Sequence, residues 1–203
     1  MAKSKKKSSI PVKLGGIVAF IVTFVIVGAV LRHFGMGSNS STNQPSNYLT
    51  TNNSTRVYTS TQDGFSINFP GNPTATDSTV QVQGVSVPTT TYERDNNNGN
   101  TDFIVSVDKY PASFDESDVN ARLEGALNGE IQNVKGATLV SSNFGTLAGY
   151  TSITGHARVS ESGQTYDLFS TDLLKGNTLY QIITVGASET DFNSFTTSFQ
   201  FTQ

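Results

Sequence analysis

Three observations predict an α+β domain, a central antiparallel sheet flanked by helices, preceded by one transmembrane helix. Residues of alternating polarity mark short strands, a long stripe of helical period interrupts them, and a shorter stripe closes the chain. Hairpin-length turns separate the strands, and such turns join antiparallel neighbours. An uncharged apolar run near the N-terminus precedes the strands. The alternative for the folded part is an all-β sandwich, in which both helical stripes are strands.

The apolar run Leu14–Leu31 predicts a membrane span. It has no charged residue, and as a helix it reaches roughly 27 Å, close to a bilayer core of about 30 Å. Five lysines precede the run and Arg32 follows it, so the positive-inside rule places residues 1–13 in the cytoplasm and the domain outside. We therefore expect the lipid bilayer to be the partner of Leu14–Leu31. The alternatives are a buried core segment, which the strongly apolar character of the run and the lysine cluster just before it disfavour, and a signal peptide cleaved near Gly35–Gly37.

The charge of the chain divides sharply at the end of this run. The first 32 residues hold six of the 13 basic residues and none of the 16 acidic residues, which leaves the rest with a net charge of −9. A domain this acidic is not expected to bind nucleic acid, because a phosphate backbone requires a basic surface. The absence of cysteine excludes disulfides, thiolate metal sites and cysteine nucleophiles. We expect no cofactor, since the sequence has neither a Walker A loop nor a dinucleotide fingerprint.

Residues 32–55 predict a flexible polar linker between the span and the domain. They are rich in Asn, Ser and Thr and nearly uncharged, so they cannot bury enough apolar surface to fold. The folded domain is expected over residues 56–203. A chain of that length buries about 70% of its unfolded surface, which is enough for a single core.

The first predicted hairpin joins Arg56–Thr61 to Phe65–Phe69 through a turn at Asp63–Gly64. In the second strand apolar and polar side chains alternate, so we expect its phenylalanines and its isoleucine to share one face in the core. A proline then ends the strand, because it lacks the N–H that a sheet requires. The turn Pro70–Pro73 is therefore interpreted as part of the framework and not as a ligand loop.

Two further hairpins precede the helix. Ser78–Arg94 predicts two strands that turn near Gln83–Gly84, and Thr101–Pro111 predicts the next strand. The segment between them, Asp95–Asp102, resembles a calcium loop. Its glycine, however, occupies the fifth position, whereas the EF-hand pattern places it sixth. An Asn-Gly hairpin turn is the favoured interpretation.

A helix is predicted within Phe114–Gly136. One stripe of apolar residues recurs at helical spacing: Val119, Leu123, Ala126, Leu127, Ile131 and Val134. The acidic residues Asp115, Glu116 and Asp118 are expected in its first turn, where the helix dipole favours anions. A solvated helix start explains these acids better than a weak cation site does. Lys135–Gly136 predicts a basic last turn and a C-cap.

Four strands and a short helix complete the predicted domain. The strands are expected at Ala137–Gly149, Tyr150–Ser160, Thr165–Lys175 and Thr178–Ala187. Ser188 then predicts an N-cap, with Asp191 at the spacing of a capping box. The phenylalanines that follow, Phe192, Phe195 and Phe199, form the second helical stripe.

The order of these motifs resembles the PsbP-like family. The motifs are "GFSINFPGNP" at Gly64–Pro73, "GTLAGYTSITGHA" at Gly145–Ala157, "GNTLYQIITVG" at Gly176–Gly186 and "DFNSFTTSF" at Asp191–Phe199. The family includes extrinsic subunits of photosystem II and many membrane-tethered bacterial proteins. The resemblance implies a sheet between helices, an α/β/α sandwich, and a non-catalytic binding or accessory module. It carries over no functional residue, and no motif marks the photosynthetic members.

His156 is the one candidate for a catalytic residue. The other histidine, His33, lies at the edge of the predicted span, and "TSITGHARV" is typical of an ordinary strand. A Ser-His-Asp triad requires a serine and a carboxylate beside the histidine, and no serine lies in a G-x-S-x-G elbow. No pair of acids is marked by its spacing as glycosidase carboxylates. We therefore assign no catalytic, cofactor-binding or metal-binding residue.

These observations predict a single-pass membrane protein that holds an extracytoplasmic binding or accessory module, with a protein of the membrane or envelope as its partner. The sequence does not identify the ligand. Two alternatives stay open: an extracytoplasmic hydrolase that uses His156, and a purely structural envelope protein.

Overall fold

The computed structural model describes residues 55–82, 84–96, 101–112, 118–161 and 163–202 of the 203 in the chain. The predicted span Leu14–Leu31, His33 and almost all of the predicted linker lie outside these residues. Within the described part, no helix is both long enough and apolar enough to cross a bilayer. The predicted anchor therefore stays a prediction.

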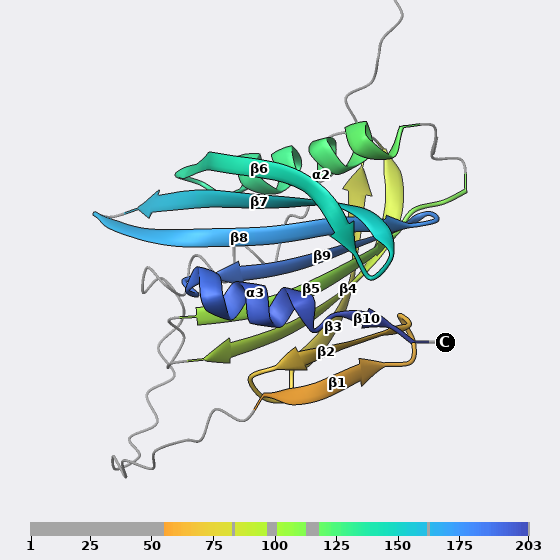
Figure 1. Cartoon of the computed structure of the whole chain (residues 1–203). Helices are drawn as coiled ribbons and strands as arrows, with labels where there is room; N and C mark the ends of the chain where they lie inside the picture. Colours follow the sequence, from red (N-terminus) through yellow and green to blue (C-terminus); the bar gives the residue numbers. More distant parts are fainter. Residues whose placement is uncertain (1–54, 83, 97–100, 113–117, 162, 203) are drawn as a thin grey trace, which may run out of the picture.

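A seven-stranded antiparallel sheet forms the centre of the domain (Figure 1), in the order β3-β4-β5-β9-β8-β7-β6. Its strands are β3 (Thr74–Val82), β4 (Val85–Asn96), β5 (Thr101–Lys109), β6 (Ala137–Leu147), β7 (Tyr150–Glu161), β8 (Gln164–Lys175) and β9 (Thr178–Val185). Strands that are neighbours in the chain pair as hairpins, as predicted. The exception is the pairing of β5 with β9, which are separated in the sequence by one helix and three strands.

A second, three-stranded sheet lies against one face of the first. It has the order β1-β2-β10 and is built from β1 (Arg56–Ser60), β2 (Phe65–Phe69) and β10 (Gln200–Phe201). The predicted hairpin of β1 and β2 is confirmed, and the apolar face of β2 is fully buried. The strand β10 was not predicted, because its two residues directly follow a helical stripe of phenylalanines.

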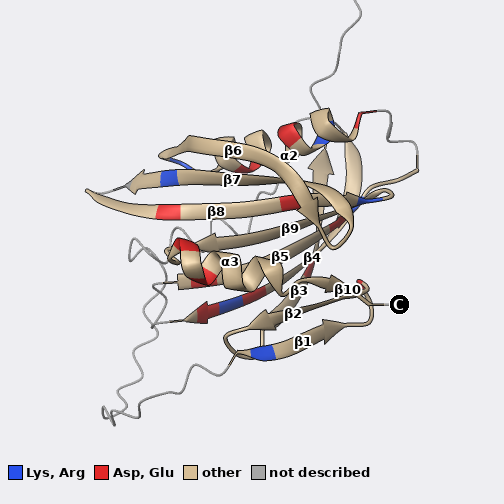
Figure 2. Ribbon diagram, in the orientation of Figure 1, with Lys and Arg blue, Asp and Glu red and all other residues tan. Residues whose placement is uncertain are grey.

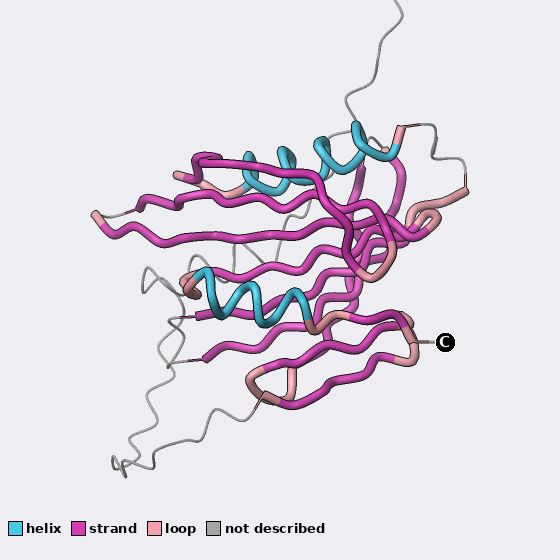
Figure 3. Tube along the Cα trace, in the orientation of Figure 1, coloured by secondary structure: helices cyan, strands magenta, loops and turns pink. Residues whose placement is uncertain are grey.

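The two helices cover opposite faces of the central sheet (Figure 3). The helix α2 (Val119–Asn133) packs on β7 and β8. The helix α3 (Glu189–Thr197) packs beside the small sheet on the other face. Both predicted helices are thus present, and the all-β alternative is wrong. The α/β/α sandwich needs correction as well, because a three-stranded sheet takes much of the second helical layer.

The central sheet consequently separates two cores. Under α2 lies a mainly aliphatic core, in which Leu123, Leu127 and Ile131 of the predicted helical stripe are buried. The core on the opposite face is mainly aromatic and brings Phe65 of β2 together with Phe199, their rings stacked 5.7 Å apart. Alternate residues of each central strand contribute to the two cores, which is why the middle of the sheet is apolar on both faces.

The ends of α2 differ from the prediction. Asp118 is the N-cap and not a first-turn residue, and its carboxylate accepts a hydrogen bond of 3.0 Å from the N–H of Ala121. Asp115 and Glu116 lie outside the described residues. The helix ends at Asn133 with Val134 as its C-cap, so Lys135 falls beyond the last turn. Gly136, two residues past the cap, has φ +79° and approaches Ser160 too closely for any side chain.

A buried acid fastens the small sheet to the large one. The carboxylate of Asp63, between β1 and β2, forms an ion pair with Lys109 of β5 at 2.6 Å and accepts a hydrogen bond from Tyr92 of β4 at 2.6 Å. Its backbone carbonyl accepts a hydrogen bond of 2.9 Å from Tyr180. Burial, followed by the hydrogen bond to Asp63, raises the pKa of Tyr92, which therefore stays a donor at all physiological pH values.

Candidate binding cleft

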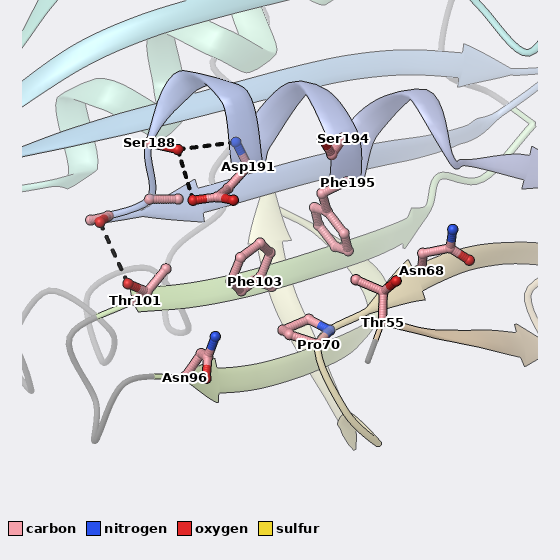
Figure 4. A pocket seen from close by; sticks show the side chains of 12 residues that line it. Thr55, Asn68, Pro70, Asn96, Thr101, Phe103, Ser188, Asp191, Ser194 and Phe195 are labelled. Atoms are coloured by element: carbon pink, nitrogen blue, oxygen red, sulfur yellow. Dashed lines mark hydrogen bonds between the residues drawn. The ribbon is translucent and has the colours of Figure 1, made fainter. Parts of the chain in front are cut away.

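A cleft of about 360 Å³ opens where the small sheet, the central sheet and α3 meet (Figure 4). Most of its lining residues are small and polar. They come from the residue before β1, the end of β2, the adjacent ends of β4 and β5, the segment between β9 and α3, and the first turns of α3. They are Thr55, Asn68, Pro70, Asn96, Thr101, Phe103, Gly186, Ala187, Ser188, Asp191, Ser194 and Phe195. Residues from both ends of the described chain thus form one site.

The N-terminus of α3 shapes one wall of the cleft. The hydroxyl of Ser188 accepts a hydrogen bond of 3.1 Å from the N–H of Asp191, as the predicted N-cap requires. It donates in turn to the carboxylate of Asp191 at 2.7 Å (Figure 4). The carboxylate lies at the positive end of the helix dipole, so this wall is already neutralised and gives no attraction to an anion.

Two aromatic rings form the floor. Phe103 of β5 and Phe195 of α3 meet edge to face, with their ring centroids 5.2 Å apart, and both side chains are buried. Rings locked in this way give the cleft a fixed apolar base. Phe103 stands on the predicted apolar face of β5, and its position in the core is confirmed.

Two half-buried amide groups face this cleft without a side-chain partner among the described residues. Among the described residues, neither Asn68 nor Asn96 makes a side-chain hydrogen bond. The backbone N–H of Asn68 is used, by the hydroxyl of Ser198 at 2.9 Å, so its side chain stands on a fixed backbone. Each amide offers two donors and an acceptor, which suits a ligand that itself carries both, such as a peptide group.

His156 lies elsewhere, on the α3 side of β7. Its Nε2 is 2.7 Å from the carboxylate of Asp167 on β8, and its ring stacks on Phe169 with centroids 4.5 Å apart. Ser141 of β6 stands opposite His156 in the sheet register, and both residues line a small hollow of about 140 Å³. No hydrogen bond joins this serine to the imidazole in the described structure. A histidine and a carboxylate are therefore paired, but without a hydrogen-bonded nucleophile.

A polar cluster lies buried between α2 and the central sheet. Gln181 of β9 donates to Glu130 of α2 at 3.4 Å and to Asp172 of β8 at 3.3 Å, and Ser170 donates to Asp172 at 2.8 Å. Burial raises the pKa of both carboxyl groups, and the proximity of Asp172 raises that of Glu130 further. Neither of the two clefts described above is lined by a residue of this cluster. Among the described residues, no group of three His, Asp or Glu side chains could hold a metal ion.

Comparison with solved structures finds a similar fold at low sequence identity. The solution structure of cyanobacterial PsbP (CyanoP) from Synechocystis sp. PCC 6803 matches with a TM-score of 0.52 and 18% identity, over 77% of this chain and 98% of that one. The chain has a PsbP-like fold. The family resemblance of the sequence motifs is thus confirmed at the level of the fold, which by itself does not determine a function.

Two other structures match the PsbP-like domain less well. LpqN, involved in cell envelope biogenesis of Mycobacterium tuberculosis, has a TM-score of 0.39 and 14% identity, over 66% of this chain and 87% of that one. A Pseudomonas aeruginosa protein of unknown function, a putative regulator, has a TM-score of 0.38 and 10% identity, over 68% and 86%. No protein-family model and no curated protein matches the chain.

Several residues to which the sequence assigned a framework role line the cleft of the PsbP-like domain. Pro70, assigned to a framework turn, lies at its rim, and Ser188 and Asp191, predicted as a helix cap, form its wall. The calcium-like segment Asp95–Asp102 lies partly outside the described residues, and its ends belong to β4 and β5. Asn68 had no sequence signal beyond its position at the end of a strand, where polar side chains are ordinary.

Proposed function

We propose that the protein is a membrane-anchored, extracytoplasmic, non-catalytic binding module. In this proposal Leu14–Leu31 holds it in the lipid bilayer, residues 1–13 face the cytoplasm, and the PsbP-like domain binds a protein partner of the membrane or envelope through the cleft. The linker ends at the cleft itself, since Thr55 belongs to its lining. The binding site would therefore lie on the side of the domain from which the tether leaves.

The observation that carries this proposal is the pair of unengaged amides over a rigid aromatic floor. A half-buried side-chain amide without a hydrogen-bond partner among the described residues can exchange its water for a ligand. The free-energy cost of removing the water is small when the ligand supplies matching donors and acceptors. Among the described residues of the lining Asp191 is the one that is ionisable, so the cleft favours an uncharged segment over a phosphate or a carboxylate. An extended peptide segment supplies N–H and C=O groups of the required kind without a charge.

Site-directed photocrosslinking in the native membrane tests the proposal. A photoreactive residue replaces Ser194, which is exposed on the cleft, or Asn120, which is exposed on α2 at the opposite face. We expect a discrete protein adduct from position 194 and none from position 120. The double substitution Asn68→Ala and Asn96→Ala should weaken the adduct by about tenfold or more, as the loss of two hydrogen bonds of about 1 kcal/mol each implies.

Two results would contradict the cleft as the binding site. One is an identical adduct pattern from positions 194 and 120, and the other is an adduct that the double substitution leaves unchanged. A purely structural envelope role would give neither a position-specific adduct nor a dependence on the two asparagines.

A hydrolase that uses His156 is the second candidate, and its hydrogen bond to Asp167 is the observation that favours it. The two proposals differ in what His156→Ala does. A binding module should keep its partner adduct and its cellular role, because the hollow at His156 is separate from the cleft. Loss of the cellular role in a variant that is folded, abundant and in the membrane would favour the hydrolase.

A further inference from the structure

The strand β6 is the most exposed regular element of the described structure. It has 11 residues, all exposed except its two ends, and it forms the outer edge of the central sheet. Of the four large apolar side chains exposed in the described residues, three belong to it, namely Leu139, Val140 and Phe144 at 38%, 51% and 45% exposure. An edge strand also presents a row of backbone N–H and C=O groups that have no partner strand.

The other sheet edges carry a charge or are short, whereas the one irregularity of β6 is a shift of its register with β7 between Leu139 and Ser141. The opposite edge of the central sheet, β3, carries the charged Asp77 at its middle. In the small sheet, β1 is five residues long and carries Arg56, and β10 has two residues. Charge and short length are the devices that prevent pairing between edges. Figure 2 shows that β6 contains no charged residue, and its sequence has no proline.

We propose that β6 is the docking strand for a second copy of this chain. Two β6 strands would pair antiparallel about a twofold axis and join the two central sheets into one. A twofold contact is isologous, so each residue meets the same strand of its partner in reverse order. The inference does not depend on the proposed function of the cleft, whose lining includes no residue of β6.

The absence of charge on β6 favours a second copy over a basic partner. The domain is acidic, so two copies repel each other overall, and an uncharged edge lets them pair without placing acids face to face. A basic partner, which the acidic domain would attract, finds no carboxylate on β6. The apolar residues are also self-complementary: an axis at Ser142 lies in the regular part of β6 that begins at Ser141, and it brings Phe144 of each copy toward Val140 of the other, the residue at the register shift.

Disulfide trapping tests the contact cleanly, because the chain has no cysteine. Ser142→Cys places one thiol at the proposed axis, and Thr76→Cys places a matched thiol on the exposed edge β3. On mild oxidation of the full chain in its membrane, Ser142→Cys should give a covalent dimer and Thr76→Cys should not. Thiols that face each other across paired strands lie within the reach of a disulfide.

A charge on β6 supplies the second arm of the test. Phe144→Lys, added to Ser142→Cys, should lower the dimer yield by about tenfold or more, since it places a lysine in each copy on a neutral edge. Its melting temperature should equal that of the parent, because Phe144 is exposed; if it does not, Val140→Lys takes its place. Equal yields at positions 142 and 76, or a yield unaffected by the lysine, would overturn the proposal. A disulfide from position 142 to a different protein would overturn it as well, because β6 would then serve another partner.

Discussion

Single buried polar groups hold the two sheets of this domain in register. The carboxylate of Asp63 is fully buried, and it contacts Lys109 and Tyr92 on two strands of the central sheet. A buried carboxylate that loses one partner still carries the free-energy cost of its removal from water. Each partner of Asp63 therefore contributes more to the stability of the domain than a contact at the surface does. The sequence identifies Asp63 only as a turn residue, since its role depends on strands more than 25 positions away.

Tyr92→Phe is therefore expected to lower the free energy of unfolding by about 1–3 kcal/mol, because it removes the hydroxyl that donates to Asp63. Tyr166→Phe is the matched control, since its hydroxyl donates to Gln164 at the surface, and it should stay within about 0.5 kcal/mol of the parent. Chemical denaturation of the full chain in detergent measures both values. Equal values for the two variants would show that the Asp63 cluster does not stabilise the domain.

At the scale of elements, helix and sheet meet at a position where only a glycine fits. A β-carbon at Gly155 of β7 would lie 2.5 Å and 2.9 Å from the two methyl carbons of Leu127 of α2 and 3.2 Å from its Cγ. Leu127 is buried in the core under the helix and has little room to move. Gly155 thus sets how closely α2 approaches the sheet.

Gly155→Ala is expected to destabilise the domain by about 1–3 kcal/mol through overpacking. Gly145→Ala, on the neighbouring strand β6, is the control, because its β-carbon would meet nothing nearer than the hydroxyl of Ser152 at 3.8 Å. Thermal unfolding monitored by circular dichroism compares the two. If Gly145→Ala lowered the melting temperature as much as Gly155→Ala, the Leu127 contact would not be the cause of the destabilisation.

The elements of the domain were largely predictable from local pattern, and their ends were not. Alternation located the strands, and the stripe through Leu123 and Leu127 located α2. The sequence placed Asp118 in the first turn of that helix together with two other acids. The backbone geometry shows that Asp118 is instead the N-cap. The cleft lay beyond prediction altogether, since Asn68 and Asn96 belong to separate strands and share no motif.

At the scale of the whole molecule, two sheets replaced the single sheet that the sequence predicted. Hairpin signals specify which strands are consecutive, but they do not determine whether β2 joins the strand after it or leaves the sheet. A pairing with β10, more than 130 residues later, decides that question. The division into two layers also explains why so many carboxyl groups are buried, because the central sheet is covered on both faces.

The buried acids predict a stability that falls as the pH rises. Burial raises the pKa of Asp108 from its usual 3.8 to about 6, although a hydrogen bond from Thr89 at 2.6 Å opposes part of that shift. Between about pH 4 and pH 6 the unfolded chain has released this proton while the folded chain still holds it, so the unfolding free energy declines with rising pH. Asp172 and Glu130 act in the same direction.

Asp108→Asn should remove the contribution of Asp108 while keeping an acceptor for Thr89. We expect the melting temperature of the variant, relative to the parent, to increase from pH 4 to pH 7. Asp77→Asn, on the exposed strand β3, controls for the loss of one acidic residue and should give no such trend. A parallel pH profile for the parent and Asp108→Asn would show that folding does not change the pKa of this carboxyl group.

The pairing of β2 with β10 also sets an order in time. A chain is made from its N-terminus onward, so the hairpin of β1 and β2 exists long before its third strand does. The aromatic core requires Phe195 and Phe199, which follow Phe65 by more than 125 residues. Until α3 and β10 have been synthesised, the face of the central sheet that carries this core is therefore uncovered. The order of synthesis thus makes β10 the last strand to join the small sheet, and the aromatic side of the domain stays open until it does.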